Sequence, residues 1–126
     1  IVSEGTAHRS MADFRVIPSN ANPVLGLQPW VTYSTVQLLT GSVPPPGTID
    51  AIKGASSTRF LLIAAADGTD EVAFATAYAS AAPDRADVWV VPSGGHIGAL
   101  PGFPDVYAVG VVWFLTDVLL EDPVTE

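Results

Sequence analysis

Several kinds of side chain are scarce in this sequence, and each shortage excludes a class of function. The 126 residues include no cysteine, two histidines, and five basic residues against thirteen acidic ones. Without thiols the chain cannot form disulfides, thiolate nucleophiles or cysteine-based zinc sites. The net charge of −8 argues against nucleic acid and anionic lipid, because both are bound mainly through Lys and Arg. With only two histidines a His-rich metal site is disfavoured, and we predict no metal and no cofactor.

A long uninterrupted apolar stretch is also missing. The longest apolar run, Tyr107–Leu115, is followed closely by Asp117 and is shorter than the ~20 residues that cross a bilayer. We therefore expect no membrane span. Apolar residues nevertheless make up 48% of the chain and charged residues only 14%, which is enough for a substantial core in one domain.

The second half of the sequence alternates between strand and helix patterns. The apolar runs "FLLIAAA" (60–66) and "VWVV" (88–91) are typical of strands buried on both faces. The Ala-rich stretch between them, residues 70–82, predicts a helix that ends before Pro83. A last helix is expected from Pro104 to Asp122. Because a strand-helix-strand crossover joins parallel neighbours, we predict an α/β fold with a parallel sheet of about three strands and flanking helices.

The first 58 residues are less regular. Ile1–Val2 predicts the end of a short strand, and the proline-rich residues 11–29 predict a loop with one helical turn. The apolar spacing over residues 30–41 indicates a helix ended by glycine. Residues 48–54 predict a short helix with Thr48 as its cap.

Acidic and imidazole side chains follow the two clearest strands at the points where they end. Asp67, Asp70 and Glu71 come after the first strand, and His96 follows the second in "PSGGH". Ligands of open parallel sheets bind at this edge, and a carboxylate there can orient an imidazole that takes a proton from a nucleophile. The ordinary interpretations are that His96 is a solvated loop residue and that the aspartates open a turn and a helix.

The order of these parts resembles the carboxyl-terminal part of the α/β-hydrolases, in which the triad acid follows the seventh strand and the histidine the eighth. "VVPSGGHIGAL" (90–100) is similar to the histidine loop of that family, and "DEV" (70–72) to the segment that carries its acid. "IVSEGTAHRS" (1–10) is similar to the end of a sixth strand. The resemblance implies a sixth strand and a variable helical or lid region in residues 1–58. Residues 59–126 then hold the last two strands, both loops and the closing helix, so that 1–126 is a single partial hydrolase domain.

The resemblance also implies roles for particular side chains. His96 matches the catalytic base and Asp70 the acid that orients it, with Asp67 and Glu4 as the alternatives for the acid. Trp30 and the neighbouring Tyr33 are either core or the lining of an acyl pocket, and we expect core.

The nucleophile of that family is missing, because no G-x-S-x-G elbow occurs anywhere in the sequence. Ser93, for example, leads into the histidine loop and not into a helix. The resemblance therefore implies part of a serine hydrolase for small-molecule acyl esters that is inactive alone. Its partner is the remaining hydrolase segment, with the nucleophile, or a second copy paired through an exposed sheet edge. The alternative is a non-catalytic binding or oligomerisation module derived from the same fold.

Overall fold

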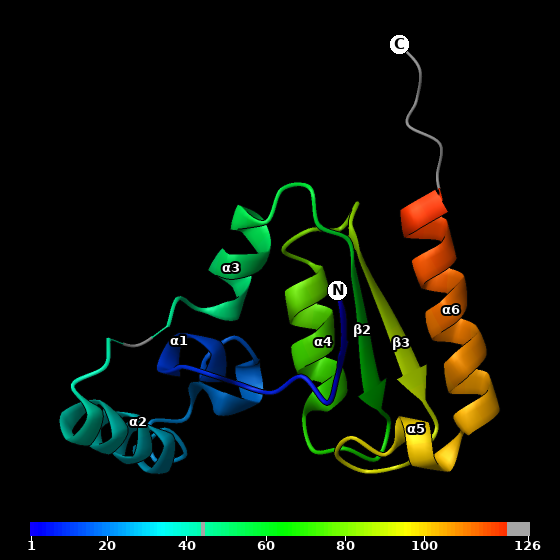
Figure 1. Ribbon diagram of the computed structural model, residues 1–126. Coiled ribbons are helices and arrows are strands. Elements are labelled where there is room, and N and C mark those ends of the chain that lie inside the picture. The colour runs from blue at the N-terminus through cyan, green and yellow to red at the C-terminus, as the bar shows by residue number, and fades with distance from the viewer. Residues whose placement is uncertain (44, 121–126) are drawn as a thin grey trace.

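The computed structural model describes residues 1–43 and 45–120 (Figure 1). The elements, in chain order, are β1 Val2–Glu4, α1 Met11–Phe14, the 3₁₀-helix η1 Pro18–Ala21, α2 Leu27–Thr40, α3 Thr48–Gly54, β2 Phe60–Ala65, α4 Glu71–Ala79, β3 Ala86–Val91, α5 Ala99–Gly102 and α6 Pro104–Leu120.

The three strands form one parallel sheet in the order β1-β2-β3. β2 lies in the centre, where Leu61 pairs with Val2 on one side and with Asp87 on the other. Every residue of β2 is buried, which explains why its sequence is a continuous apolar run. The predicted α/β class and parallel sheet are confirmed.

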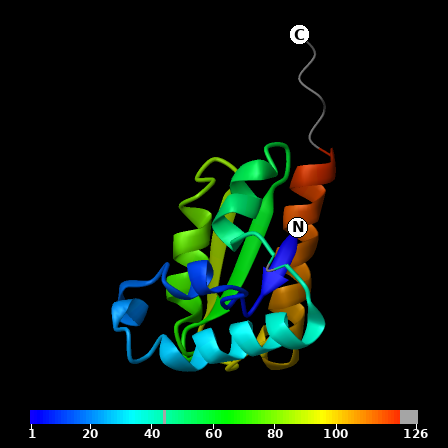
Figure 2. The ribbon, with the colours of Figure 1, turned by 90° about the vertical axis from the view of Figure 1, so that its left-hand side faces the viewer.

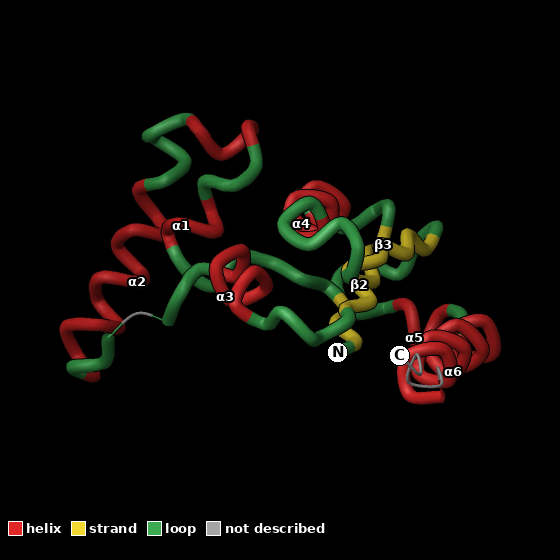
Figure 3. Tube along the Cα trace, turned by 90° about the horizontal axis from the view of Figure 1, so that it is seen from above, coloured by secondary structure: helices red, strands yellow, loops and turns green. Residues whose placement is uncertain are grey.

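Helices cover both faces of this sheet, as the view from above shows (Figure 3). On one face, Phe74 and Tyr78 of α4 pack in a core cluster with Leu62 of β2. On the other face, Phe114 of α6 packs with Ile63. Alternate β2 side chains point to opposite faces, so the same strand supplies both halves of the core.

The segment between β1 and β2 carries α1, η1, α2 and α3, and it lies on the side of the sheet away from α6 (Figures 1 and 2). Ile17 and Ile52 join this segment to the α4 side of the core. The buried Asp13 ties its helices together, because its carboxylate accepts the backbone N–H of Thr48 at 2.6 Å and the Thr48 hydroxyl at 3.1 Å. In contrast, α2 buries only Pro29.

Several predicted boundaries need correction. The first helical turns, α1 and η1, make residues 11–29 more regular than expected, and α2 begins at Leu27. Thr48 is not a cap: Gly47 precedes α3 without a side-chain cap, and the Thr48 hydroxyl bonds to Asp13. The short helix α5 had no counterpart in the sequence pattern. The last helix is confirmed from Pro104 to Leu120, and its predicted end at 121–122 lies outside the described residues.

Candidate functional site

The carboxyl ends of the three strands meet at one edge of the sheet, because all three are parallel. Gly5 follows β1, the segment 66–70 follows β2, and the segment 92–98 follows β3. We call residues 92–98 the histidine loop. Side chains and backbone from all three strand ends come together around His96.

The central contact of the site joins Glu71, the first residue of α4, to His96. Nδ1 of the imidazole lies 2.8 Å from Oε1 of the carboxylate. The other oxygen, Oε2, accepts the backbone N–H of Ala65 at 3.1 Å, so both carboxylate oxygens are engaged. A carboxylate only accepts hydrogen bonds, so this contact assigns a hydrogen to Nδ1 and leaves Nε2 as the ring atom able to take a proton.

Burial differs sharply between the two partners. The side chain of Glu71 is 4% exposed, whereas that of His96 is 61% exposed. Glu71 fits because Gly68 has no side chain: a Cβ there would lie 2.7 Å from the Glu71 carboxyl carbon. The Glu71 carboxylate is therefore fixed in place next to an accessible imidazole, an arrangement that can support proton transfer to or from a group that reaches the ring.

The structure corrects the predicted acid. Asp70, the residue chosen from the "DEV" pattern, is exposed, and among the described residues it forms no hydrogen bond with His96. Its backbone takes the left-handed conformation, with φ of 61°, directly before α4 begins. Glu71, the first helical residue, has the buried side chain. The acid that contacts His96 is thus one position beyond the residue that the sequence pattern favoured.

The two alternative acids, Asp67 and Glu4, accept backbone hydrogen bonds from the histidine loop and the residue after it, and in the described residues neither is hydrogen-bonded to the imidazole. Asp67 accepts the backbone N–H groups of Gly95 at 3.0 Å and Gly94 at 3.3 Å. The Gly95 bond, followed by the Gly94 bond, lowers the pKa of the Asp67 carboxyl below its ordinary value. Glu4, from the end of β1, accepts the backbone N–H of Ala99 at 2.6 Å, immediately after the loop.

Gly5 is a site residue that sequence reasoning missed. It has φ of +64°, and a Cβ on it would lie 2.9 Å from both Cε1 and Nδ1 of His96. Its backbone N–H donates to Ile63 O, which fixes Gly5 against the sheet. The imidazole therefore packs directly on the backbone at the end of β1. The only available signal was a glycine in the polar segment that follows the predicted strand end Ile1–Val2.

The second histidine lies in a separate cluster. The side chain of His8 is half-buried among aromatic rings, including those of Phe14 and Phe74. Its Nδ1 lies 2.7 Å from the hydroxyl of Tyr33. These contacts join α2 to the rest of the protein, and they indicate a structural role for His8.

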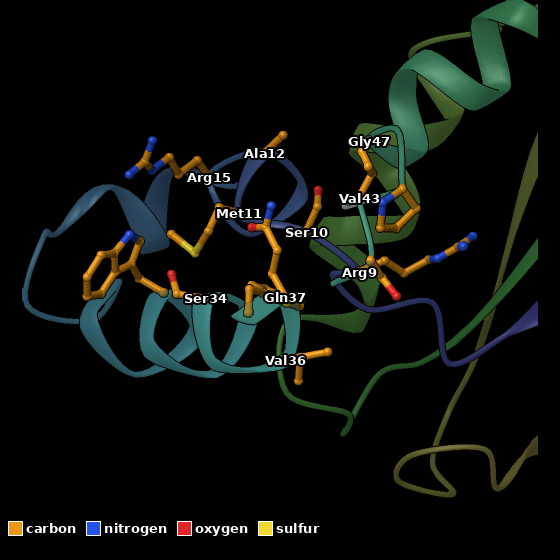
Figure 4. Close-up of a pocket in the computed structure, with 14 residues that line it drawn as sticks. Arg9, Ser10, Met11, Ala12, Arg15, Ser34, Val36, Gln37, Val43 and Gly47 are labelled. Atoms are coloured by element: carbon orange, nitrogen blue, oxygen red, sulfur yellow. The ribbon is translucent and has the colours of Figure 1, made fainter. Parts of the chain in front are cut away.

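A cavity of about 570 Å³ lies between α1, α2 and the segment before α3 (Figure 4). Trp30 and Tyr33 line it, while neither Glu71 nor His96 does. Trp30 is 54% exposed, so the prediction that it belongs to the core is wrong. The residues that line this cavity include no pairing of a carboxylate with an imidazole like that of Glu71 and His96.

Two further properties concern only residues 1–43 and 45–120. There, no group of three or more His, Asp or Glu side chains is placed to hold a metal ion. No helix within the same residues combines the length and apolar character needed to traverse a bilayer.

Comparisons with known proteins found no match, so a proposal for the function has to rest on the fold and the site geometry. No protein-family model matches the sequence, no curated protein matches it, and no solved structure resembles it.

Proposed function

We propose that this chain supplies the acid and the base of a serine hydrolase of the α/β-hydrolase type that acts on small acyl esters. The contact between Glu71 and His96 carries the proposal. The proposal is supported by the order of the elements along the chain. An acid follows the central strand, and then come a helix, a parallel neighbouring strand and a histidine at the same edge of the sheet. In this assignment Glu71 replaces Asp70 as the acid.

Each side chain then has a defined task in ester hydrolysis. A serine from a segment outside this sequence attacks the ester carbonyl as Nε2 of His96 takes its hydroxyl proton. His96 passes that proton to the departing alcohol, then activates a water that releases the acid product. Glu71 keeps the hydrogen on Nδ1 and stabilises the positive imidazolium through the 2.8 Å contact.

The apolar surface exposed on α6 supports the proposal that a further hydrolase segment is the partner of this chain. On α6, Val109, Val112 and Trp113 are 70%, 60% and 71% exposed. β1 is an edge strand with pairing groups available on its outer side. Contiguous exposed apolar side chains and an open strand edge usually mark an interaction surface. A segment that adds strands beyond β1 and a helix beside α6 would extend the sheet and bring the nucleophile to the same edge.

The test begins with the encoding DNA and with proteins that copurify with the chain. The assembled protein should contain a G-x-S-x-G elbow, encoded upstream in the same frame or in a partner. It should hydrolyse p-nitrophenyl butyrate, and His96→Ala should lower kcat by about 10²–10⁴-fold. Asp70→Asn is the matched control, because this exposed acid lies one residue from Glu71 and should leave kcat unchanged. Full activity in His96→Ala, or no elbow in any associated sequence, would refute the proposal.

A second function, a non-catalytic binding module, is favoured by one observation: the chain presents large apolar faces but contains no nucleophile elbow. A stable complex that does not hydrolyse the ester, with a partner that lacks the elbow, would select this alternative.

A further inference from the structure

The histidine loop contains backbone angles that are unfavourable for an ordinary residue. Gly94 and Gly95 have φ of +136° and +56°, and Ile97 has φ of +58°. Glycine accepts such angles freely, but a β-branched residue in the left-handed region is strained. Gly94 and Gly98 also approach so closely that a Cβ on Gly98 would collide with the Gly94 carbonyl. External contacts must therefore hold this conformation.

Those contacts come from carboxylates on both sides of the imidazole. Asp67, after β2, accepts the two N–H groups that directly precede His96, those of Gly94 and Gly95. Glu4, at the end of β1, accepts the N–H of Ala99, three residues after the imidazole. The two anchors thus bracket His96 from two different strands.

We propose that Asp67 and Glu4 are positioning residues that hold the histidine loop so that His96 meets Glu71. Neither acid touches the imidazole ring through a hydrogen bond in the described residues. Each acts through backbone N–H groups on one side of it. Loss of an anchor lets the strained loop relax, and the ring then moves away from the fixed, buried carboxylate of Glu71. The inference rests on the proposed function only for its effect on catalysis.

A spectroscopic test follows the position of the imidazole hydrogen in the full chain. Long-range ¹H–¹⁵N NMR of the neutral ring distinguishes a hydrogen on Nδ1 from one on Nε2. We expect wild-type His96 to carry it on Nδ1, opposite Glu71. Asp67→Ala and Glu4→Ala should each give a mixed population, whereas Glu4→Gln should retain the wild-type signal because its amide oxygen still accepts the Ala99 N–H. Asp70→Asn, on the same edge, should not change it.

Far-UV circular dichroism establishes that each variant is folded. If Asp67→Ala does not fold, Asp67→Leu, which has a similar shape and no acceptor atom, takes its place. An unchanged Nδ1 signal in the folded variants that lack an acceptor at position 67 and at position 4 would overturn the inference. In the assembled hydrolase the alanine variants should lower kcat by about 10²-fold, the scale associated with misplacing a catalytic group by 1 Å. A changed NMR signal together with no hydrolysis by the wild-type assembly would leave the positioning role standing and refute the proposed function.

Discussion

Nδ1 of His96 lies 2.8 Å from Oε1 of Glu71, although the two residues are 25 positions apart in sequence. They meet because β2 and β3 are parallel neighbours, so the segments that follow them leave the sheet at the same edge. The acid is almost completely buried and the imidazole is largely exposed. This relationship supports the proposed catalytic pair and predicts how substitutions around it behave.

Replacing Glu71 should destabilise the protein far more than replacing its neighbour Asp70. Glu71→Ala leaves the buried N–H of Ala65 without its acceptor, which costs about 1–3 kcal/mol in the free energy of unfolding. Asp70→Asn changes an exposed side chain, and Asn tolerates the left-handed backbone, so the change should stay within about 0.5 kcal/mol. Urea unfolding curves measure both values. Equal losses would contradict the inward placement of Glu71.

A comparison of Gly5→Ala with Gly41→Ala distinguishes the stability lost through a clash with the imidazole from the stability lost through backbone strain. Both glycines have nearly the same positive φ, +64° and +65°, so each alanine should pay about 1–2 kcal/mol for the left-handed backbone. Only Gly5 has the His96 ring within 3 Å of the added Cβ, whereas nothing lies within 4 Å at Gly41. We expect a larger loss of stability for Gly5→Ala and displaced His96 ring resonances in NMR spectra. Identical behaviour of the two variants would show that the ring does not pack on Gly5.

Asp67 should contribute to an acid-dependent loss of stability. Its pKa in the folded protein is lowered, chiefly by the N–H of Gly95 and then by that of Gly94, from an ordinary value of 3.8. The stabilisation is therefore complete above about pH 5 and is lost as the pH falls below 4, when the folded carboxyl takes up its proton. In urea unfolding at a series of pH values, the gap between wild type and Asp67→Asn should narrow over that range. A gap that stays constant down to pH 2 would argue against the two N–H bonds.

Tyr78 should make the free energy of unfolding fall as the pH rises into the alkaline range, the opposite of the effect of Asp67. Burial raises the pKa of its hydroxyl from 10.0 to about 12, and the nearby Asp13 charge adds to the shift. The folded protein thus disfavours the tyrosinate, so the stability due to this group is present below pH 10 and is lost as the pH rises from 10 to 12. Tyr78→Phe should weaken the alkaline decline in the free energy of unfolding. An equally steep decline in the variant would assign the effect to other groups.

The isolated chain should associate through α6 and the β1 edge. Trp113→Glu places a charge in the exposed apolar stripe of α6 and should reduce concentration-dependent association in sedimentation velocity runs. Leu38→Glu on α2 is the control, because Leu38 is 84% exposed and α2 lies on the other side of the sheet from α6 (Figure 1). A compact monomer at all concentrations, or equal effects of the two substitutions, would show that α6 is not the association surface.

The central strand and the last helix were predictable because their local patterns agree with the structure. β3 was expected to be buried on both faces, but it is an edge strand in which only Val91 is buried. The run Phe60–Ala65 is apolar throughout because β2 is covered on both faces, and Pro104 begins a long helix as proline often does. Residues 11–29 were harder, because their prolines suggested loops, whereas α1 depends on the Ser10 cap and on Asp13 contacts made at a distance in sequence.

The amino-acid sequence alone determined that three acids and one histidine follow neighbouring parallel strands, because strand periodicity and chain order are local properties. Only the tertiary structure decided which acid meets the imidazole. That choice depends on which way each side chain leaves a tight turn, on the space that Gly68 leaves for Glu71, and on the Gly5 backbone beneath the ring. These are packing relationships between segments far apart in the chain, and no single stretch of sequence contains them.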